Sequence, residues 1–397
     1  MSNTTSDDWV HGWVSSNCGR GTIDILWSCL SAIFLCVWTV IHLPVPRYNG
    51  EAEHSLRTKI VRSKIVPALI GLFVPEYSAM IALDELVEAR HAKHLMRIHL
   101  GGDNFTLSRG FFLKMGGFYL KSASGVCHPL LKYDIHRLTH NYSRLFEDPV
   151  TQVKAISQDQ IDDCANADTF TKLIACVQGI WLMSQVISRL CQHRAVTLLE
   201  VSSTAYVCCA IIAYVAWWKK PQDCNLPIFI TCSDEAMKEI QDKFWDGNAL
   251  GHSWAEFLWA GRLPIGAWSL KTRRPSTSFS SLTLTDLWAL IAPTIAVGGV
   301  HIASWNIGLP SKVEHWMWRA STICCSIIPV LFAILVHFYD QRTSRLRHKV
   351  LAFLLFLTAT LYGLTRLYMI VEVFLSLRTL PPSAFECIQW SSFVPHI

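Results

Sequence analysis

The sequence predicts an all-α membrane protein, a bundle of seven or eight transmembrane helices, and three observations favour this fold class. The chain is 51% hydrophobic and only 16% charged, whereas a soluble chain carries about 25% charged residues. Several apolar runs reach the ~20 residues that a helix needs to cross a bilayer. Basic residues cluster beside these runs, as they do on the cytoplasmic side of membrane proteins.

Seven apolar runs are predicted as spans because each is long and carries few charges. In chain order they cover residues 23–43, 65–86, 173–190, 198–217, 284–304, 322–338 and 351–375. Residues 1–397 are therefore expected to form a single polytopic membrane domain, with polar loops over 132–168 and 221–281. Pro75 lies inside the second run, where a proline frees a backbone carbonyl and kinks the helix.

Residues 111–131 are a doubtful eighth span. The segment is apolar, but it contains Lys114, Lys121 and a Gly-Gly pair, so it fits a poor span, a re-entrant segment or an interfacial helix. Eight spans with the N-terminus outside are favoured, because the four basic loops then face the cytoplasm. The basic residues of 88–100 remain on the wrong side in this arrangement.

The eight-span arrangement also assigns sides to three glycosylation sequons. Those at Asn3 and Asn104 are expected in the lumen, so the protein is expected to be a glycoprotein. The sequon at Asn141 is expected in the cytoplasm, because one span separates it from Asn104.

Ionisable residues inside the apolar runs are the candidate functional groups, because such residues are costly at membrane depth and mark sites or buried pairs. Glu76 follows the Pro75 kink, and Arg366 interrupts the last run. Arg366 could pair with Glu76, with Glu314 or with neighbours of Glu372, so a structural pairing and a functional role both remain open. A charge near a helix end could instead snorkel to the interface.

No metal site and no cofactor are expected. The fourteen cysteines show no CxxC pair and no Cys/His spacing typical of metal ligands. Asp162 and Asp163 lack the DDxxD spacing that would hold magnesium against a diphosphate, and a polar helix start is the simpler interpretation.

Six sequence blocks carry a resemblance to a known family. They are CGRGT from residue 18, VPEY from 74, MGGF from 115, AWWKKPQD from 216, GGVHIASWNIGLPSKVEHWMWRAS from 298 and RLYMIVEVFLSLRTLPPSAF from 366. The chain resembles a large family of fungal multi-pass membrane proteins. Its characterised members are membrane-bound terpene cyclases of meroterpenoid biosynthesis clusters. The resemblance implies a cyclase of fungal secondary metabolism that closes a prenyl chain on an aromatic or quinone-like head.

Acid-initiated cyclisation of an epoxide needs a carboxylic acid that stays protonated near neutral pH, which burial in an apolar site can provide. The carbocation that follows needs aromatic faces and exclusion of water. Glu76 is the expected proton donor. The alternative acids are Asp24, Glu314 and Glu372. The residues expected to bind substrate are Trp27, Tyr77, His301, Trp305 and Arg366.

Structural interpretations compete with each of these roles. Tryptophans such as Trp27 and Trp305 are common in interfacial belts. His301 fits a neutral core histidine that hydrogen-bonds between helices, or a proton relay that orients Glu314.

The expected partners are a small prenylated or epoxidised substrate, the lipid bilayer and other biosynthetic enzymes of the same pathway. The expected location is the endoplasmic reticulum membrane. Nucleic acid is not expected, because the net charge of +5 reflects basic loops. Two other function classes fit the sequence. A transporter of a hydrophobic metabolite would use broken helices and inverted repeats, and a non-catalytic membrane scaffold would need no buried acids.

Overall fold

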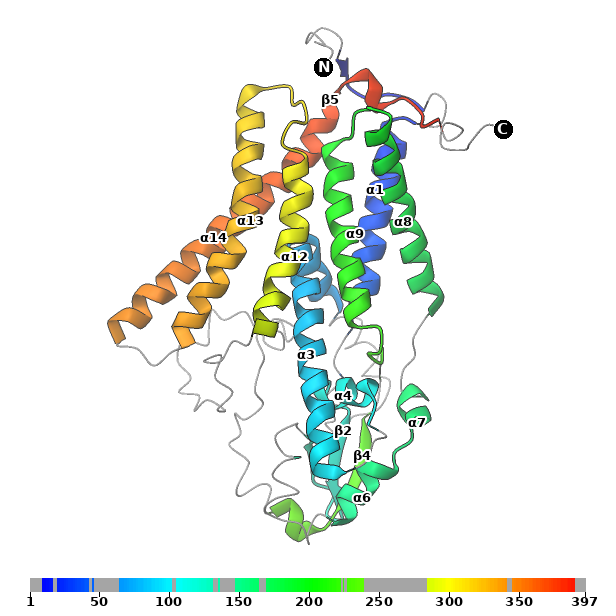
Figure 1. The fold of residues 1–397 in the computed structure, drawn as a ribbon, viewed down its shortest axis with the longest axis vertical. Coiled ribbons are helices and arrows are strands. Elements are labelled where there is room, and N and C mark those ends of the chain that lie inside the picture. The colour runs from blue at the N-terminus through cyan, green and yellow to red at the C-terminus, as the bar shows by residue number, and fades with distance from the viewer. Residues whose placement is uncertain are drawn as a thin grey trace.

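The computed structural model describes residues 9–16, 20–42, 45, 64–101, 105–130, 135, 147–163, 169–222, 224, 227–238, 284–340 and 345–389. The chain forms a long helical bundle with a small sheet at one end and both chain termini at the other (Figure 1). The long helices are α1 (Thr22–Val40), α3 (Pro75–Leu100), α8 (Thr169–Cys191), α9 (Leu198–Ala216), α12 (Leu284–Ala303), α13 (Lys312–Asp340) and α14 (Arg345–Leu375). The short helices are α4 (Leu107–Lys114), α6 (Glu147–Ala155), α7 (Gln158–Asp163), η4 (Ser376–Arg378) and η5 (Pro382–Ala384).

Five helices of the described chain are long and apolar enough to cross a membrane. They cover Thr22–Val40, Leu173–Cys191, Leu198–Ala216, Lys312–Leu335 and Lys349–Arg378. These agree with five of the predicted spans. The apolar part of α12, Ile291–Ala303, is shorter than these five candidate spans. Apart from α3, which runs towards the sheet end like α1, the long helices alternate in direction: α1, α9 and α13 run towards the sheet end, whereas α8, α12 and α14 run away from it (Figure 1).

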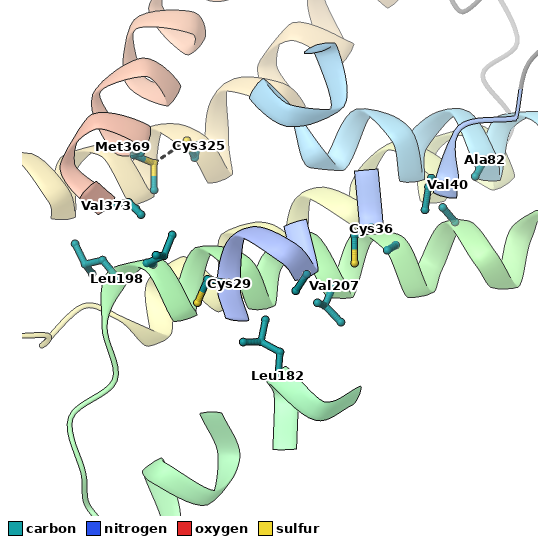
Figure 2. Packing of buried hydrophobic residues seen from close by; sticks show 14 of the residues in the cluster. Cys29, Cys36, Val40, Ala82, Leu182, Leu198, Val207, Cys325, Met369 and Val373 are labelled. Carbon is teal, nitrogen blue, oxygen red and sulfur yellow. Dashed lines mark hydrogen bonds between the residues drawn. The ribbon is translucent and has the colours of Figure 1, made fainter. Parts of the chain in front are cut away.

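The core of the bundle lies where α1 packs against α8 and α9. Cys29 of α1 lies near Leu182 of α8 and Val207 of α9 in this core, and Val40, further along α1 past Cys36, lies beside Ala82 of α3 (Figure 2). All of these side chains are buried, so the two cysteines act as small apolar packing groups.

The predicted span over 111–131 is wrong, because this segment does not form a long helix. After α4 ends, the chain enters β2 (Phe118–Ser122) and β3 (Cys127–Pro129), which pair antiparallel. β4 (Ile228–Cys232) pairs parallel to β2, from Phe118↔Ile228 to Ser122↔Cys232, giving the sheet order β3-β2-β4. Four of the five residues of β2 are buried, so its apolar character reflects a small protein core.

That small core lies at the sheet end of the molecule. It joins α3, α4, α6 and the sheet, and its buried members include Phe112, Phe118, Leu120 and Ile230. The predicted polar loops 132–168 and 221–281 contribute α6, α7 and β4 to this region.

The predicted span over 65–86 is broken. Residues Lys64–Phe73 and Pro75–Leu100 form two helices whose axes differ in direction by 117°. The break follows from Pro75, which has no N–H and disfavours helical geometry at the residue before it. Val74 accordingly adopts φ −134° and ψ 77°.

The two ends of the chain are joined at the pole opposite the sheet. β1 (Val10–His11) pairs antiparallel with β5 (Thr379–Leu380). Arg20 donates from Nε to the Ala384 carbonyl at 2.7 Å and from Nη2 to Glu200 at 2.7 Å. Arg189 donates to the carbonyls of Ser383 and Ala384, so the segment after α14 is tied to α8 and α9.

Candidate functional site

Two groups of buried ionisable residues lie within the helical bundle. The first surrounds the break between the Lys64–Phe73 helix and α3, and we call it the helix-break cluster: Glu76, Tyr206, Tyr362 and Arg366. The second joins the start of α13 to the end of α14, and we call it the carboxyl pair: Glu314 and Glu372. Glu76, Arg366 and Glu372 are each exposed by 4% or less, which is unusual for charged side chains and identifies both groups as candidate sites.

The helix-break cluster satisfies backbone groups that the break exposes. The last carbonyls of a helix have no partner within it. Tyr206 of α9 donates its hydroxyl to the Leu72 carbonyl, and Arg366 of α14 donates from Nε to the Phe73 carbonyl at 2.9 Å. Side chains from two distant helices therefore close the carboxyl end of the Lys64–Phe73 helix.

Glu76 lies on the other side of the break, in the first turn of α3. Tyr362, one turn before Arg366, donates its hydroxyl to Glu76 Oε1. Glu76 Oε2 is buried and has no hydrogen-bond partner among the described residues. Arg366 also interacts electrostatically with the Glu76 carboxylate, which confirms that these two side chains belong to one cluster.

The charges of the cluster match the dipoles of the two helix ends. The carboxyl end of a helix carries partial negative charge and the amino end partial positive charge. Arg366 lies against the carboxyl end of the Lys64–Phe73 helix, and Glu76 lies at the amino end of α3. The helix-break cluster therefore neutralises both ends inside the apolar bundle.

The carboxyl pair has different surroundings. Glu314 is in the first turn of α13, and its Oε1 is paired with Arg378. Tyr368 donates its hydroxyl to the Glu314 backbone carbonyl at 3.3 Å. Glu372 lies one turn beyond Tyr368 on α14 and interacts electrostatically with Glu314. Glu314 Oε2 and Glu372 Oε1 are both buried without a hydrogen-bond partner among the described residues.

His301 packs as a core residue near the helix-break cluster. Its Nδ1 donates to the Val297 carbonyl at 2.8 Å, and its ring lies 6.1 Å from that of Trp318. Trp318 Nε1 in turn donates to Ser304 Oγ at 3.0 Å. His301 is therefore a buried core residue as expected, but its hydrogen bond stays within α12 and only its ring contact reaches α13.

Of the remaining predicted site residues, Asp24, Trp27 and Trp305 have other contacts or are exposed, and Tyr77 adjoins Glu76 in the chain. Asp24 accepts from the Gly21 N–H at 2.7 Å and caps the start of α1. Trp27 is 75% exposed on the outside of α1, and the Trp305 ring stacks against the Arg319 guanidinium at 5.1 Å. Tyr77 is half-buried beside Glu76, and its hydroxyl has no partner among the described residues. The predicted glycosylation sites Asn3 and Asn104 lie outside the described residues.

Two tyrosines of the helix-break cluster, Tyr206 and Tyr362, are missing from the sequence-based site. Tyrosines are ordinary in apolar helices, so neither residue stands out alone. The one available signal is spacing, because Tyr362 lies four residues before Arg366 and so faces the same side of α14.

A separate ion pair lies further along α3. Lys220, just after α9, donates to Glu85 of α3 at 2.5 Å, and Trp217 Nε1 donates to the same carboxylate at 2.8 Å. Burial lowers the pKa of Lys220, and the Glu85 carboxylate opposes that shift. The contact holds α3 against α9 where the bundle meets the sheet region.

Within the described chain, no group of three or more His, Cys, Asp or Glu residues is placed to hold a metal ion. The fold and the two acid groups thus define a class: a predominantly helical protein of membrane type with carboxyl groups buried between its helices. The chain belongs to a family described as "Family of unknown function (DUF8562)", whose model matches residues 1–245 and 283–397. No curated protein and no solved structure matches the chain.

Proposed function

We propose that this protein is a multi-pass membrane enzyme of the terpene cyclase type, which uses a buried carboxylic acid to start cyclisation of a prenylated aromatic epoxide. The observation that carries the proposal is the carboxyl pair. Glu372 is 3% exposed and has an oxygen with no partner among the described residues. A buried acid of this kind is the group that protonation of an epoxide requires.

The surroundings of the acids decide which of them donates the proton. A nearby arginine favours the ionised form of a carboxyl group, and a second carboxylate favours the protonated form. Glu76 is held at the helix break by Tyr362 beside Arg366, whereas Glu372 has Glu314 as its nearest carboxylate, with Tyr368 and Arg378 also close to it. We therefore prefer Glu372 as the proton donor, although the sequence analysis predicts Glu76 for this role.

The two members of the carboxyl pair take complementary roles in this proposal. Arg378 pairs with Glu314, which leaves Glu372 as the member of the pair with no ion-pair partner among the described residues. Glu372 gives its proton to the epoxide oxygen as the C–O bond breaks, and the alkene electrons close the ring on the resulting cation. The cyclised carbocation then loses a proton to Glu314, which ends the reaction. The product is an isomer of the substrate, so no oxidant or reductant is consumed.

The proposed location is the endoplasmic reticulum membrane. The alternation of α1, α8, α9, α12, α13 and α14 supports a multi-pass arrangement. The lipid-facing sides of α13 and α14 carry exposed apolar residues such as Ile327, Phe353 and Phe356, which suits a protein whose hydrophobic substrate arrives from the bilayer.

The test is production of the full chain in microsomes supplied with a panel of prenylated aromatic epoxides. The expected result is a cyclic product with the mass of its substrate, formed by wild type and absent from empty-vector membranes. Return of every substrate unchanged, by protein shown to be folded and membrane-inserted, would refute the proposal. A Glu386→Gln variant, which changes a largely exposed carboxylate, serves as the matched control.

A transporter of a hydrophobic metabolite is the second candidate, and the broken helix favours it. Transporters bind substrates or ions at the ends of discontinuous helices. Here the carbonyls of Leu72 and Phe73 already accept from Tyr206 and Arg366, which leaves them less available to an ion. Flux of the intact compound across proteoliposomes, without conversion, would favour this candidate over the enzyme.

A further inference from the structure

Within the described chain, the apolar helix before the break covers Lys64–Phe73. At 1.5 Å per residue it is about 15 Å long, half of the ~30 Å hydrocarbon core. The next helix does not continue its direction, because the axes differ by 117°. α3 starts near the middle of the bundle and runs towards the sheet (Figure 1). The chain therefore turns back where a spanning helix would continue.

The turn is held from both sides by a single face of α14. Tyr362 binds Glu76 after the break, and Arg366 binds Phe73 before it. Tyr206 of α9 adds a third contact, at Leu72. A backbone turn inside a membrane is tolerated where protein groups satisfy its polar atoms, and these contacts meet that condition.

We propose that residues 64–100 form a re-entrant hairpin that enters and leaves on the same side of the membrane, with Arg366 and Tyr206 as the residues that position its tip. Six crossings, by α1, α8, α9, α12, α13 and α14, then place both chain termini on the opposite side. This inference does not depend on the proposed enzymatic activity.

The basic residues agree with this arrangement. Arg90 on α3, Lys114 at the end of α4, Lys219 after α9 and Arg347 at the start of α14 all belong to the sheet end of the bundle. Positive residues favour the cytoplasmic side, so the sheet end is cytoplasmic. The hairpin also removes the conflict in the eight-span prediction, which left the basic residues of 88–100 on the wrong side.

Glycosylation tests the sidedness directly. The sequon at Asn104 follows the hairpin, between Gly101 and Phe105. We expect a chain with Asn104 as its sole sequon to show no endoglycosidase-sensitive shift, and a chain with Asn3 as its sole sequon to show one. A shift with each of the two sequons alone would overturn the hairpin, because residues 64–100 would then have to cross the membrane in addition to α1.

A second measurement uses chemical labelling of the sheet. Ala123 is exposed in the β2–β3 turn. In sealed microsomes, whose outer face is cytoplasmic, an impermeant maleimide should label Ala123→Cys above the wild-type background without detergent. Labelling that appears only after detergent, in a chain whose Asn3 is glycosylated, would place the sheet and the N-terminal segment on the same side and overturn the hairpin.

Paired substitutions test the positioning role of Arg366. Arg366→Met leaves Glu76 buried without its cation, so we expect membrane abundance to fall several-fold. Adding Glu76→Gln removes the uncompensated charge and should restore at least half of the abundance. Arg347→Met, which removes an exposed arginine from the same helix, should match wild type. Equal abundance of the single and double variants would overturn the assigned role.

Discussion

The ion pair between Arg20 and Glu200 is predicted to dominate the stability of the pole that joins the two chain ends. The Glu200 side chain is 1% exposed, and its Oε1 lies 2.7 Å from Arg20 Nη2. Glu200 Oε2 also accepts from the Thr197 N–H at 2.9 Å, which caps α9. Glu200→Gln keeps the capping geometry but leaves the Arg20 guanidinium buried without a counter-charge.

The expected cost follows from this burial. Removing one partner of a buried ion pair destabilises a protein by about 3–5 kcal/mol, which is a large part of the ~5–15 kcal/mol by which proteins are usually stable. The matched control is Glu386→Gln, because Glu386 is 58% exposed and lies 3.7 Å from Arg194. An exposed pair of this kind contributes about 0–1 kcal/mol.

The assay is thermal unfolding of the detergent-purified full chain, followed by intrinsic tryptophan fluorescence. We expect a clear fall in melting temperature for Glu200→Gln and almost none for Glu386→Gln. Equal melting temperatures for the two variants would refute the reasoning, because burial would then not set the strength of these ion pairs.

Three further predictions concern protonation and metals. Hydrogen bonds from the Ser124 side chain and backbone lower the pKa of Asp234. Its contribution to stability is therefore present above the ordinary aspartate pKa of about 3.9 and is lost as the pH falls below it. Asp234→Asn should narrow the difference in melting temperature between neutral and acidic buffer, and an unchanged difference would contradict this. A hydrophobic carbodiimide, which reacts with protonated carboxyl groups, should modify Glu372 and spare Glu76, as read by peptide mass spectrometry; modification of Glu76 alone would reverse the assignment. EDTA should leave cyclisation in microsomes unchanged, whereas a loss that magnesium restores would indicate a metal-dependent reaction.

Hydropathy predicted most of the bundle because lipid-facing helices must be apolar over about 20 residues. The predicted spans 23–43, 173–190 and 198–217 overlap α1, α8 and α9, respectively. The same signal failed at 111–131, where β2 is apolar because protein surrounds it. Composition cannot separate a strand buried in a small core from a weak membrane segment.

The helix break illustrates what sequence reasoning can and cannot reach. Pro75 predicts a kink at this position, but a kink does not fix the direction of the next helix. The reversal depends on contacts from Tyr206 and Arg366, which lie more than 130 residues along the chain from the carbonyls they bind. No local pattern encodes such a contact.

The sequence analysis predicted the individual acids and the arginine of the candidate site, but not how they are grouped. Glu76, Arg366 and Glu372 are charged residues in apolar runs, so each is conspicuous without a structure. Their grouping was not predictable, because it depends on the packing of α3, α13 and α14. The structure places Glu76 with Arg366 and Glu372 with Glu314.

The most direct test of the central claim compares the turnover of Glu372→Gln and Glu76→Gln in microsomes, at equal membrane abundance of the two variants. Glutamine keeps the shape of the side chain and removes the transferable proton. Loss of a general acid typically lowers turnover about 10²–10⁴-fold. We therefore expect the turnover of Glu372→Gln to fall at least about a hundredfold, and to fall further than the turnover of Glu76→Gln. Near-normal product from Glu372→Gln would contradict the account, because the reaction would then start without the acid that the carboxyl pair supplies.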